Sequence, residues 1–243
     1  MDKREIELMQ KLMDAFGPSG FEREINKLVK QEVKNFADEI LTDRLGSVAF
    51  TLEGKGPKIL LTGHTDEVGF IVSSITDEGF LTFNQLGGWW DQVLLAQKVI
   101  IRGKKGDIIG VIASKPPHIL PQEERKKIVE KKDMFIDIGA TSKEEVEELG
   151  IRVGDGVVPW SPFSVIRDGK VAMGKAFDDR IGTFVIMEAL RRIKEQKIPH
   201  NNKIIGAATV QEEVGLRGAQ TMAQTVNPDV AIVLEVDIAG DVP

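Results

Sequence analysis

Residues that can ligate metals or transfer protons gather in four short segments of the chain. These are His64-Thr65-Asp66, Phe177-Asp178-Asp179-Arg180, Gln211-Glu212-Glu213 and Glu235-Val236-Asp237. Imidazole nitrogens together with carboxylate oxygens suit Zn²⁺, Co²⁺ or Mn²⁺. Hydrolysis at a metal needs both ligands and a base that accepts the proton of water. The four segments together therefore predict a hydrolytic metal site.

Each segment has an ordinary structural interpretation when taken alone. A histidine at a strand end is often structural, and an aspartate before a helix is a favoured N-cap. Adjacent glutamates such as Glu212 and Glu213 are common on solvated surfaces, and Glu235 could simply mark a polar strand exit. The hypothesis of a metal site therefore depends on where the surrounding strands place the four segments.

The pattern of strands and helices predicts that the segments converge. Compact apolar runs over residues 58–62, 203–210 and 229–236 indicate buried strands, with helices between the last two and over residues 181–193. Alternation of this kind is typical of a parallel sheet, whose strands all end at one edge. The period of two in a strand places His64 and Asp66 on the same side, so Asp66 could orient His64 or a neighbouring ligand.

The N-terminal part is predicted to hold two helices. The first covers residues 4–16 and ends at Gly17-Pro18, which cannot continue a helix. Ser19 and Glu22 then have the spacing of a capping box, with Ser19 as the N-cap of the second helix.

The middle of the chain has a different character. Between residues 68 and 168, short strand-like runs alternate with glycine and proline, which favours a small barrel or sandwich. The predicted organisation is an α/β catalytic domain in two parts, residues 1–67 and 169–243, interrupted by a β-rich domain over residues 68–168. The fold class is therefore α/β with an inserted β-barrel-like domain.

Composition narrows the class of protein. The chain has 243 residues, of which 42% are hydrophobic and 29% charged, which is enough for a core and argues against disorder. The net charge of −6 argues against a nucleic acid partner. With no cysteine and three histidines, any metal must be held by His, Asp and Glu. No signal peptide is apparent and no apolar run is long enough for a bilayer, so no membrane partner and a cytoplasmic location are expected.

Seven motifs, spread over nearly the whole chain, resemble the tetrahedral or glutamyl-type metallo-aminopeptidases. Members of this family often carry the name cellulase or endoglucanase. The motifs are Gly17-Pro18-Ser19-Gly20-Phe21-Glu22, His64-Thr65-Asp66-Glu67-Val68-Gly69-Phe70, Pro116-Pro117-His118, Asp137-Ile138-Gly139-Ala140, Lys175-Ala176-Phe177-Asp178-Asp179-Arg180, Thr209-Val210-Gln211-Glu212-Glu213-Val214-Gly215 and Asp241-Val242-Pro243.

The resemblance implies a zinc-peptidase-like α/β domain that binds two divalent metal ions, zinc or cobalt first and manganese as a further option. It also implies that a water activated by the two metals removes N-terminal residues from peptides, and that chains assemble, as dimers up to dodecamers, through the inserted domain. The implied roles are a metal ligand at His64, a ligand shared by both metals at Asp178, further ligands at Glu213 and Glu235, a general base at Glu212 and an orienting carboxylate at Asp66.

One departure from the family concerns a second metal-binding histidine, which lies beyond Pro243 by resemblance. Neither His118 nor His200 matches its motif. We therefore expect a C-terminally truncated chain whose second metal is short of a ligand. Two alternative functions stay open on the sequence alone. One is an inactive assembly or regulatory subunit. The other is an endoglucanase, which is disfavoured because aromatic residues make up 6% of the chain and tyrosine is absent.

Overall fold

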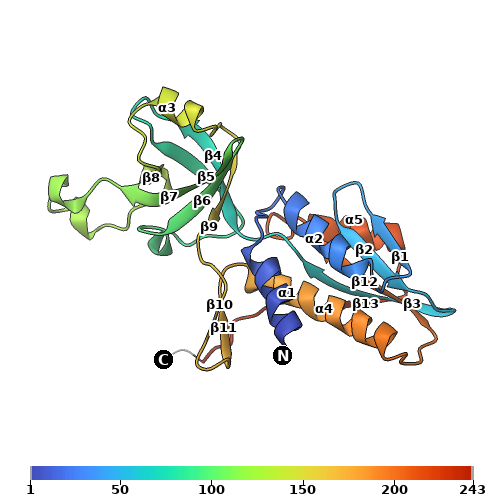
Figure 1. The fold of residues 1–243 in the computed structure, drawn as a ribbon. Coiled ribbons are helices and arrows are strands. Elements are labelled where there is room, and N and C mark those ends of the chain that lie inside the picture. The colour runs from blue at the N-terminus through green and yellow to red at the C-terminus, as the bar shows by residue number, and fades with distance from the viewer. Residues whose placement is uncertain (1, 242–243) are drawn as a thin grey trace. The chain divides into compact units, whose positions relative to one another are not determined.

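The structure is a computed structural model that describes residues 2–241. The last motif named above, Asp241-Val242-Pro243, therefore lies partly outside the described residues. The chain forms two compact units, one of Met1–Glu67 with Pro162–Pro243 and one of Val68–Ser161. An α/β unit and a β-barrel unit confirm the predicted fold class, and each is described here by itself (Figure 1).

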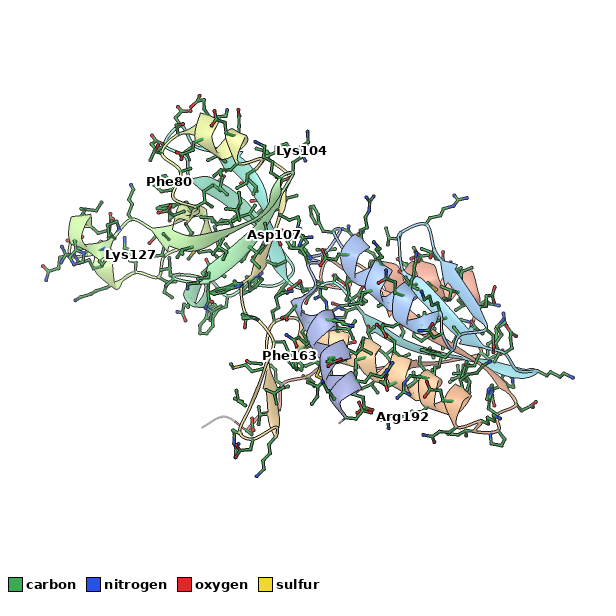
Figure 2. All side chains as sticks on the ribbon, in the orientation of Figure 1. Phe80, Lys104, Asp107, Lys127, Phe163 and Arg192 are labelled. Carbon is green, nitrogen blue, oxygen red and sulfur yellow. The ribbon has the colours of Figure 1, made fainter. Side chains whose placement is uncertain are left out.

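The boundary after the barrel unit lies earlier than residue 168, where the sequence had placed it. Residues 162–168 belong to the α/β unit because they form half of a hairpin, β10 (Ser164–Ile166) paired with β11 (Val171–Met173). Phe163, labelled in Figure 2, also stacks on Phe177 with ring centroids 6.3 Å apart.

The α/β unit is built on a five-stranded sheet with the order β1-β2-β12-β3-β13. β3, β12 and β13 are parallel, and β2 and β1 continue the sheet in antiparallel fashion. The strands are β1 (Glu39–Thr42), β2 (Val48–Leu52), β3 (Gly56–His64), β12 (Asn202–Thr209) and β13 (Val230–Val233). The predicted parallel arrangement of residues 58–62, 203–210 and 229–236 is confirmed.

Helices cover both faces of this sheet (Figure 1). Apolar side chains of α1, α2 and α4 form the larger core with β2, and Met222 of α5 packs on the opposite face against Ala49, Leu60 and Ile205. The helices are α1 (Lys3–Asp14), α2 (Arg23–Val33), α4 (Phe177–Glu195) and α5 (Arg217–Val226). This layering buries the middle of the sheet and leaves the carboxyl ends of its parallel strands to carry polar groups.

Two expectations for this unit are wrong. The strand at residues 229–236 was expected to be buried, but all four residues of β13 are exposed because β13 is the edge strand. The Ser19–Glu22 capping box is also absent. Residues 18–21 form a turn, with the Phe21 amide donating to the Pro18 carbonyl at 2.8 Å, so α2 begins only at Arg23.

The barrel unit is a closed barrel of six strands in the order β4-β5-β8-β7-β6-β9. Its interior is filled by one apolar cluster that includes Phe70, Leu81, Ile101 and Ile136. The elements are β4 (Gly69–Ile75), β5 (Leu81–Leu86), β6 (Lys98–Gly103), β7 (Gly106–Ser114), β8 (Met134–Asp137), α3 (Lys143–Glu148) and β9 (Gly156–Pro159). Ser142 caps α3, because its hydroxyl accepts the Glu145 amide. Among the described residues, no helix is both long enough and apolar enough to cross a membrane.

Candidate metal centre

His64 is the last residue of β3, and its side chain is 2% exposed. Its main chain is held on both sides, because its amide donates to Asp179 Oδ2 at 3.2 Å and its carbonyl accepts the Thr183 hydroxyl at 3.1 Å. The ring nitrogen Nδ1 donates to the Asp66 carbonyl oxygen at 3.0 Å. These contacts fix the ring and leave Nε2 to face the other site residues, as expected of an imidazole metal ligand.

Carboxylates from three other segments surround His64 Nε2. Asp178 Oδ1 lies 3.1 Å from it, Glu212 Oε2 3.7 Å and Glu235 Oε1 3.8 Å. The potential ligand atoms form two groups that share His64, one with Asp178 and Glu235 and one with Glu212 and Glu213. Within each group these atoms lie within 4.8 Å of one another. The convergence predicted at the carboxyl ends of β3, β12 and β13 is therefore present.

Asp66 connects two of these segments. It is fully buried, and its Oδ1 lies 3.4 Å from His64 Nδ1. The same carboxylate accepts the Glu212 amide at 3.0 Å, the Glu213 amide at 3.1 Å and the Ser19 hydroxyl at 2.5 Å. Asp66 therefore touches His64, as its predicted orienting role requires, and also fixes the main chain of the glutamate pair.

The electrostatics of the site favour a cation. Burial lowers the pKa of His64, but hydrogen bonds to Asp178 and Asp66 and the charge of Glu235 outweigh it and raise this pKa to about 11. Burial and the charge of Asp178 raise the pKa of Glu213 to about 7. The carboxylates thus hold a proton on the imidazole, and a divalent cation would satisfy the same field. His64, Asp178, Glu213 and Glu235 therefore fit a bound metal by the chemistry of their donor atoms.

No role was predicted for Asp179, which the structure places against the backbone of His64. Its side chain is buried, and burial together with the charge of Glu235 raises its pKa to about 7. It also accepts the Gly182 amide at 3.1 Å, which ties the start of α4 to the end of β3. The adjacent Asp178-Asp179 pair was visible in the sequence, but nothing there indicated that only the first faces Nε2.

A buried ionic network of Arg180, Glu67 and Lys175 was also not predicted. Arg180 Nη2 donates to Glu67 Oε1 at 3.0 Å, and Lys175 Nζ donates to the two Glu67 oxygens at 2.7 and 2.9 Å. Arg180 Nε also donates to the Thr65 carbonyl at 2.8 Å. The network therefore holds residues 64–67, the segment that carries His64 and Asp66, in place through Thr65 and Glu67.

Lys175 predicts a specific dependence of stability on pH. Burial, reinforced by Arg180 and opposed by Glu67, lowers its pKa to about 8, from 10.5 in the unfolded chain. Between these values the unfolded state binds more protons, so this residue makes the free energy of unfolding rise with pH. We expect wild type to gain about 2 kcal/mol relative to Lys175→Met between pH 7 and pH 10. Urea denaturation at both pH values measures this, and parallel pH profiles of the two proteins would contradict it.

The other two histidines lie away from the centre. His200 is exposed before the start of β12, at the end of that strand opposite to Glu212, and its Nδ1 contacts the Asn202 carbonyl at 2.9 Å. His118 belongs to a short 3₁₀ turn of the barrel unit. Neither is among the residues that group with His64 in the described part of the chain.

Comparisons with known proteins agree with this fold and site. Residues 46–243 match the model of the M42 glutamyl aminopeptidase family. The Escherichia coli (strain K12) protein FrvX is 44% identical over 98% of this chain and 66% of its own length. The chain belongs to the M42 glutamyl aminopeptidase family. It spans about two thirds of the length of FrvX.

Two solved structures show the same fold. The TET aminopeptidase of a marine sediment archaeon of the Thaumarchaeota is 68% identical with a TM-score of 0.98, over 99% of this chain and 68% of that one. The TET1 peptidase of Pyrococcus horikoshii, which can assemble into a tetrahedron or a large octahedral shell, is 36% identical with a TM-score of 0.86, over 98% of this chain and 72% of that one. The predicted peptidase fold and family resemblance are confirmed.

Proposed function

We propose that this chain carries the metal ligands and the general base of a metal-dependent aminopeptidase that removes N-terminal residues from peptides. The observation that supports this most directly is the ring of carboxylates within 3.8 Å of His64 Nε2. His64, Asp178, Glu213 and Glu235 would hold two divalent ions, zinc or cobalt in preference to manganese. When bound, such ions polarise a scissile carbonyl and lower the pKa of water.

Glu212 is the proposed base. Its side chain is about one quarter exposed, in contrast to the buried Asp66, so its carboxylate is open to a water molecule. Burial, together with the charges of Glu235 and Asp66, raises its pKa above the ordinary glutamate value although His64 opposes this. A carboxylate with a raised pKa accepts a proton from water more readily and can then return it to the leaving amine. Asp66 holds the His64 ring and the backbone of Glu212 and Glu213 in their relative positions.

The proposal also covers the oligomeric state, the cellular location and the function classes that are disfavoured. We propose a homo-oligomer, because the TET1 peptidase of Pyrococcus horikoshii can assemble into a tetrahedron or a large octahedral shell. A cytoplasmic location is proposed from the absence of cysteine, and the net charge of −6 disfavours nucleic acid. An endoglucanase is disfavoured because the carboxylates gather around one imidazole, whereas sugar hydrolysis needs them on both sides of a glycosidic bond.

The second candidate is an assembly or regulatory subunit without activity of its own. It is favoured by one observation, that no second histidine joins the centre in the described part of the chain.

Metal content distinguishes these two functions. We expect about two Zn²⁺ or Co²⁺ ions per chain after chelator treatment, dialysis and reloading, because the two groups of ligand atoms that share His64 offer donors to two ions, the second with one ligand fewer. Elemental analysis measures this, and hydrolysis of aminoacyl anilides before and after chelation tests the activity. A content near zero, with no hydrolysis, would overturn the aminopeptidase proposal and support the subunit.

A further inference from the structure

We infer that Ser19 and Glu22 are positioning residues of the metal centre. The turn over residues 17–22 holds residues 64–67 and residues 211–213 in place relative to each other. This inference rests on the proposed function, because it assigns the turn to the same centre. Neither side chain caps α2, although their spacing is that of a capping box. Their polar groups are instead directed at residues 64–67 and 211–213.

The first contact of the turn is with the segment that carries His64. The Ser19 hydroxyl donates to Asp66 Oδ2 at 2.5 Å, and both side chains are buried. The Glu67 amide donates to the Gly17 carbonyl at 3.0 Å, and Pro18 forms an isolated parallel bridge with Glu67. The turn therefore lies alongside this segment like a short extra strand.

The second contact is with the segment that carries the glutamate pair. Glu22 Oε1 accepts the Gln211 amide at 3.1 Å and the Gly20 amide at 2.8 Å. Gln211 has a φ of 54°, a conformation that costs a non-glycine residue about 1 kcal/mol or more. The bond to Glu22 is one of the contacts that hold this conformation, which sends the chain from the end of β12 towards Asp66.

Asp66 connects the two segments that the turn contacts. Its carboxylate must accept from Ser19, Glu212 and Glu213 at once and also lie near His64 Nδ1. Without the Ser19 hydroxyl, one donor to a buried carboxylate is lost and its orientation is less restricted. Because Asp66 bonds the backbone of both glutamates, such a change would reach the ligand Glu213 and the ring of His64 together. Removal of an outer hydrogen-bond partner of this kind typically lowers metal affinity 10–100-fold.

Co²⁺ titration of the whole chain tests this inference. The proteins compared are wild type, Ser19→Ala, Ser19→Thr, which restores a hydroxyl, and Ser47→Ala. Ser47 is a matched control, because it is a buried serine of the same unit whose hydroxyl has no hydrogen-bond partner among the described residues. The measurements are the Co²⁺ dissociation constant by calorimetry and the visible absorption spectrum of bound Co²⁺. Circular dichroism verifies that each variant is folded.

We expect Ser19→Ala to bind Co²⁺ about 10-fold more weakly with an altered spectrum, Ser19→Thr to recover most of the affinity, and Ser47→Ala to match wild type. Wild-type affinity and spectrum in folded Ser19→Ala would overturn the inference while leaving the proposed function intact. Absence of Co²⁺ binding in wild type would overturn the proposed function and this inference with it. Should Ser19→Ala not fold, Ser19→Cys fills the site with a slightly larger thiol that is only a weak donor, and it must also bind Co²⁺ more weakly than wild type.

The role of Glu22 is tested separately with two substitutions. Glu22→Gln keeps an oxygen that can accept the Gln211 amide, whereas Glu22→Ala removes the acceptor. We expect the alanine variant to lose Co²⁺ affinity about 10-fold and the glutamine variant to retain most of it. Equal affinities in the two folded variants would contradict a positioning role for Glu22.

Discussion

Glu212→Gln is expected to lower kcat for peptide hydrolysis about 10³-fold while the metal content stays at the wild-type level. The amide retains the shape of the side chain but cannot accept a proton from water. The main-chain bond from residue 212 to Asp66 does not involve the side chain, so the backbone of the segment should be unchanged. Steady-state kinetics with aminoacyl anilides, together with elemental analysis, measure both quantities.

Glu213→Gln is the matched comparison, because it changes the neighbouring carboxylate of the same segment. The proposed roles differ, so this variant is expected to lose metal affinity by about 10-fold or more. Full activity of Glu212→Gln would contradict its assignment as the base. Loss of metal from Glu212→Gln, with none from Glu213→Gln, would indicate that the two roles are exchanged.

Arg180→Met is expected to destabilise the α/β unit by about 3 to 5 kcal/mol. Arg180 is fully buried, and its removal leaves Glu67 with one fewer cation. It also removes donors from the carbonyls of Leu12, Ala15 and Thr65, which lie at the end of α1 and beside His64. Buried acceptors without partners are costly, so the loss should exceed that of an ordinary ion pair. Urea denaturation followed by circular dichroism measures the free energy of unfolding.

Arg192→Met is the control for this prediction. Arg192, labelled in Figure 2, lies on the same helix α4 and pairs with Glu5 of α1, but its side chain is 53% exposed. The Glu5 carboxylate is 6% exposed, but water reaches Arg192, so this pair is expected to contribute less than the fully buried network of Arg180. Similar losses from the two substitutions would show that burial of Arg180 adds nothing to its contribution.

The main features of the site could be predicted from the sequence because they follow from strand geometry. Apolar runs that end in polar residues locate the carboxyl ends of parallel strands, and this was sufficient to bring His64, Glu212 and Glu235 together. Different roles could be assigned to adjacent residues at those strand ends only through the family resemblance. Asp178 and Asp179 illustrate this, because the structure turns one towards Nε2 and the other towards the His64 backbone.

Contacts between polar groups far apart in the sequence could not be predicted in the same way. Ser19 and Glu22 have the spacing of a local capping motif, but both bond to residues distant in the chain. Local spacing cannot show that a more favourable buried partner such as Asp66 competes for the same hydroxyl. The exposure of β13 was missed for a similar reason, since an apolar composition does not reveal that a strand lies at the edge of its sheet.

The closure of the barrel limits how copies of this protein can associate. Every strand of the closed barrel has a paired neighbour on both sides, so little strand edge is open for a partner to extend, chiefly along β5, which pairs with β8 only at Leu81 and Ile136. Assembly through this unit would instead depend on exposed side chains such as Trp90, Ile119 and Ile128. Single substitutions could then dissociate the copies without disturbing the fold.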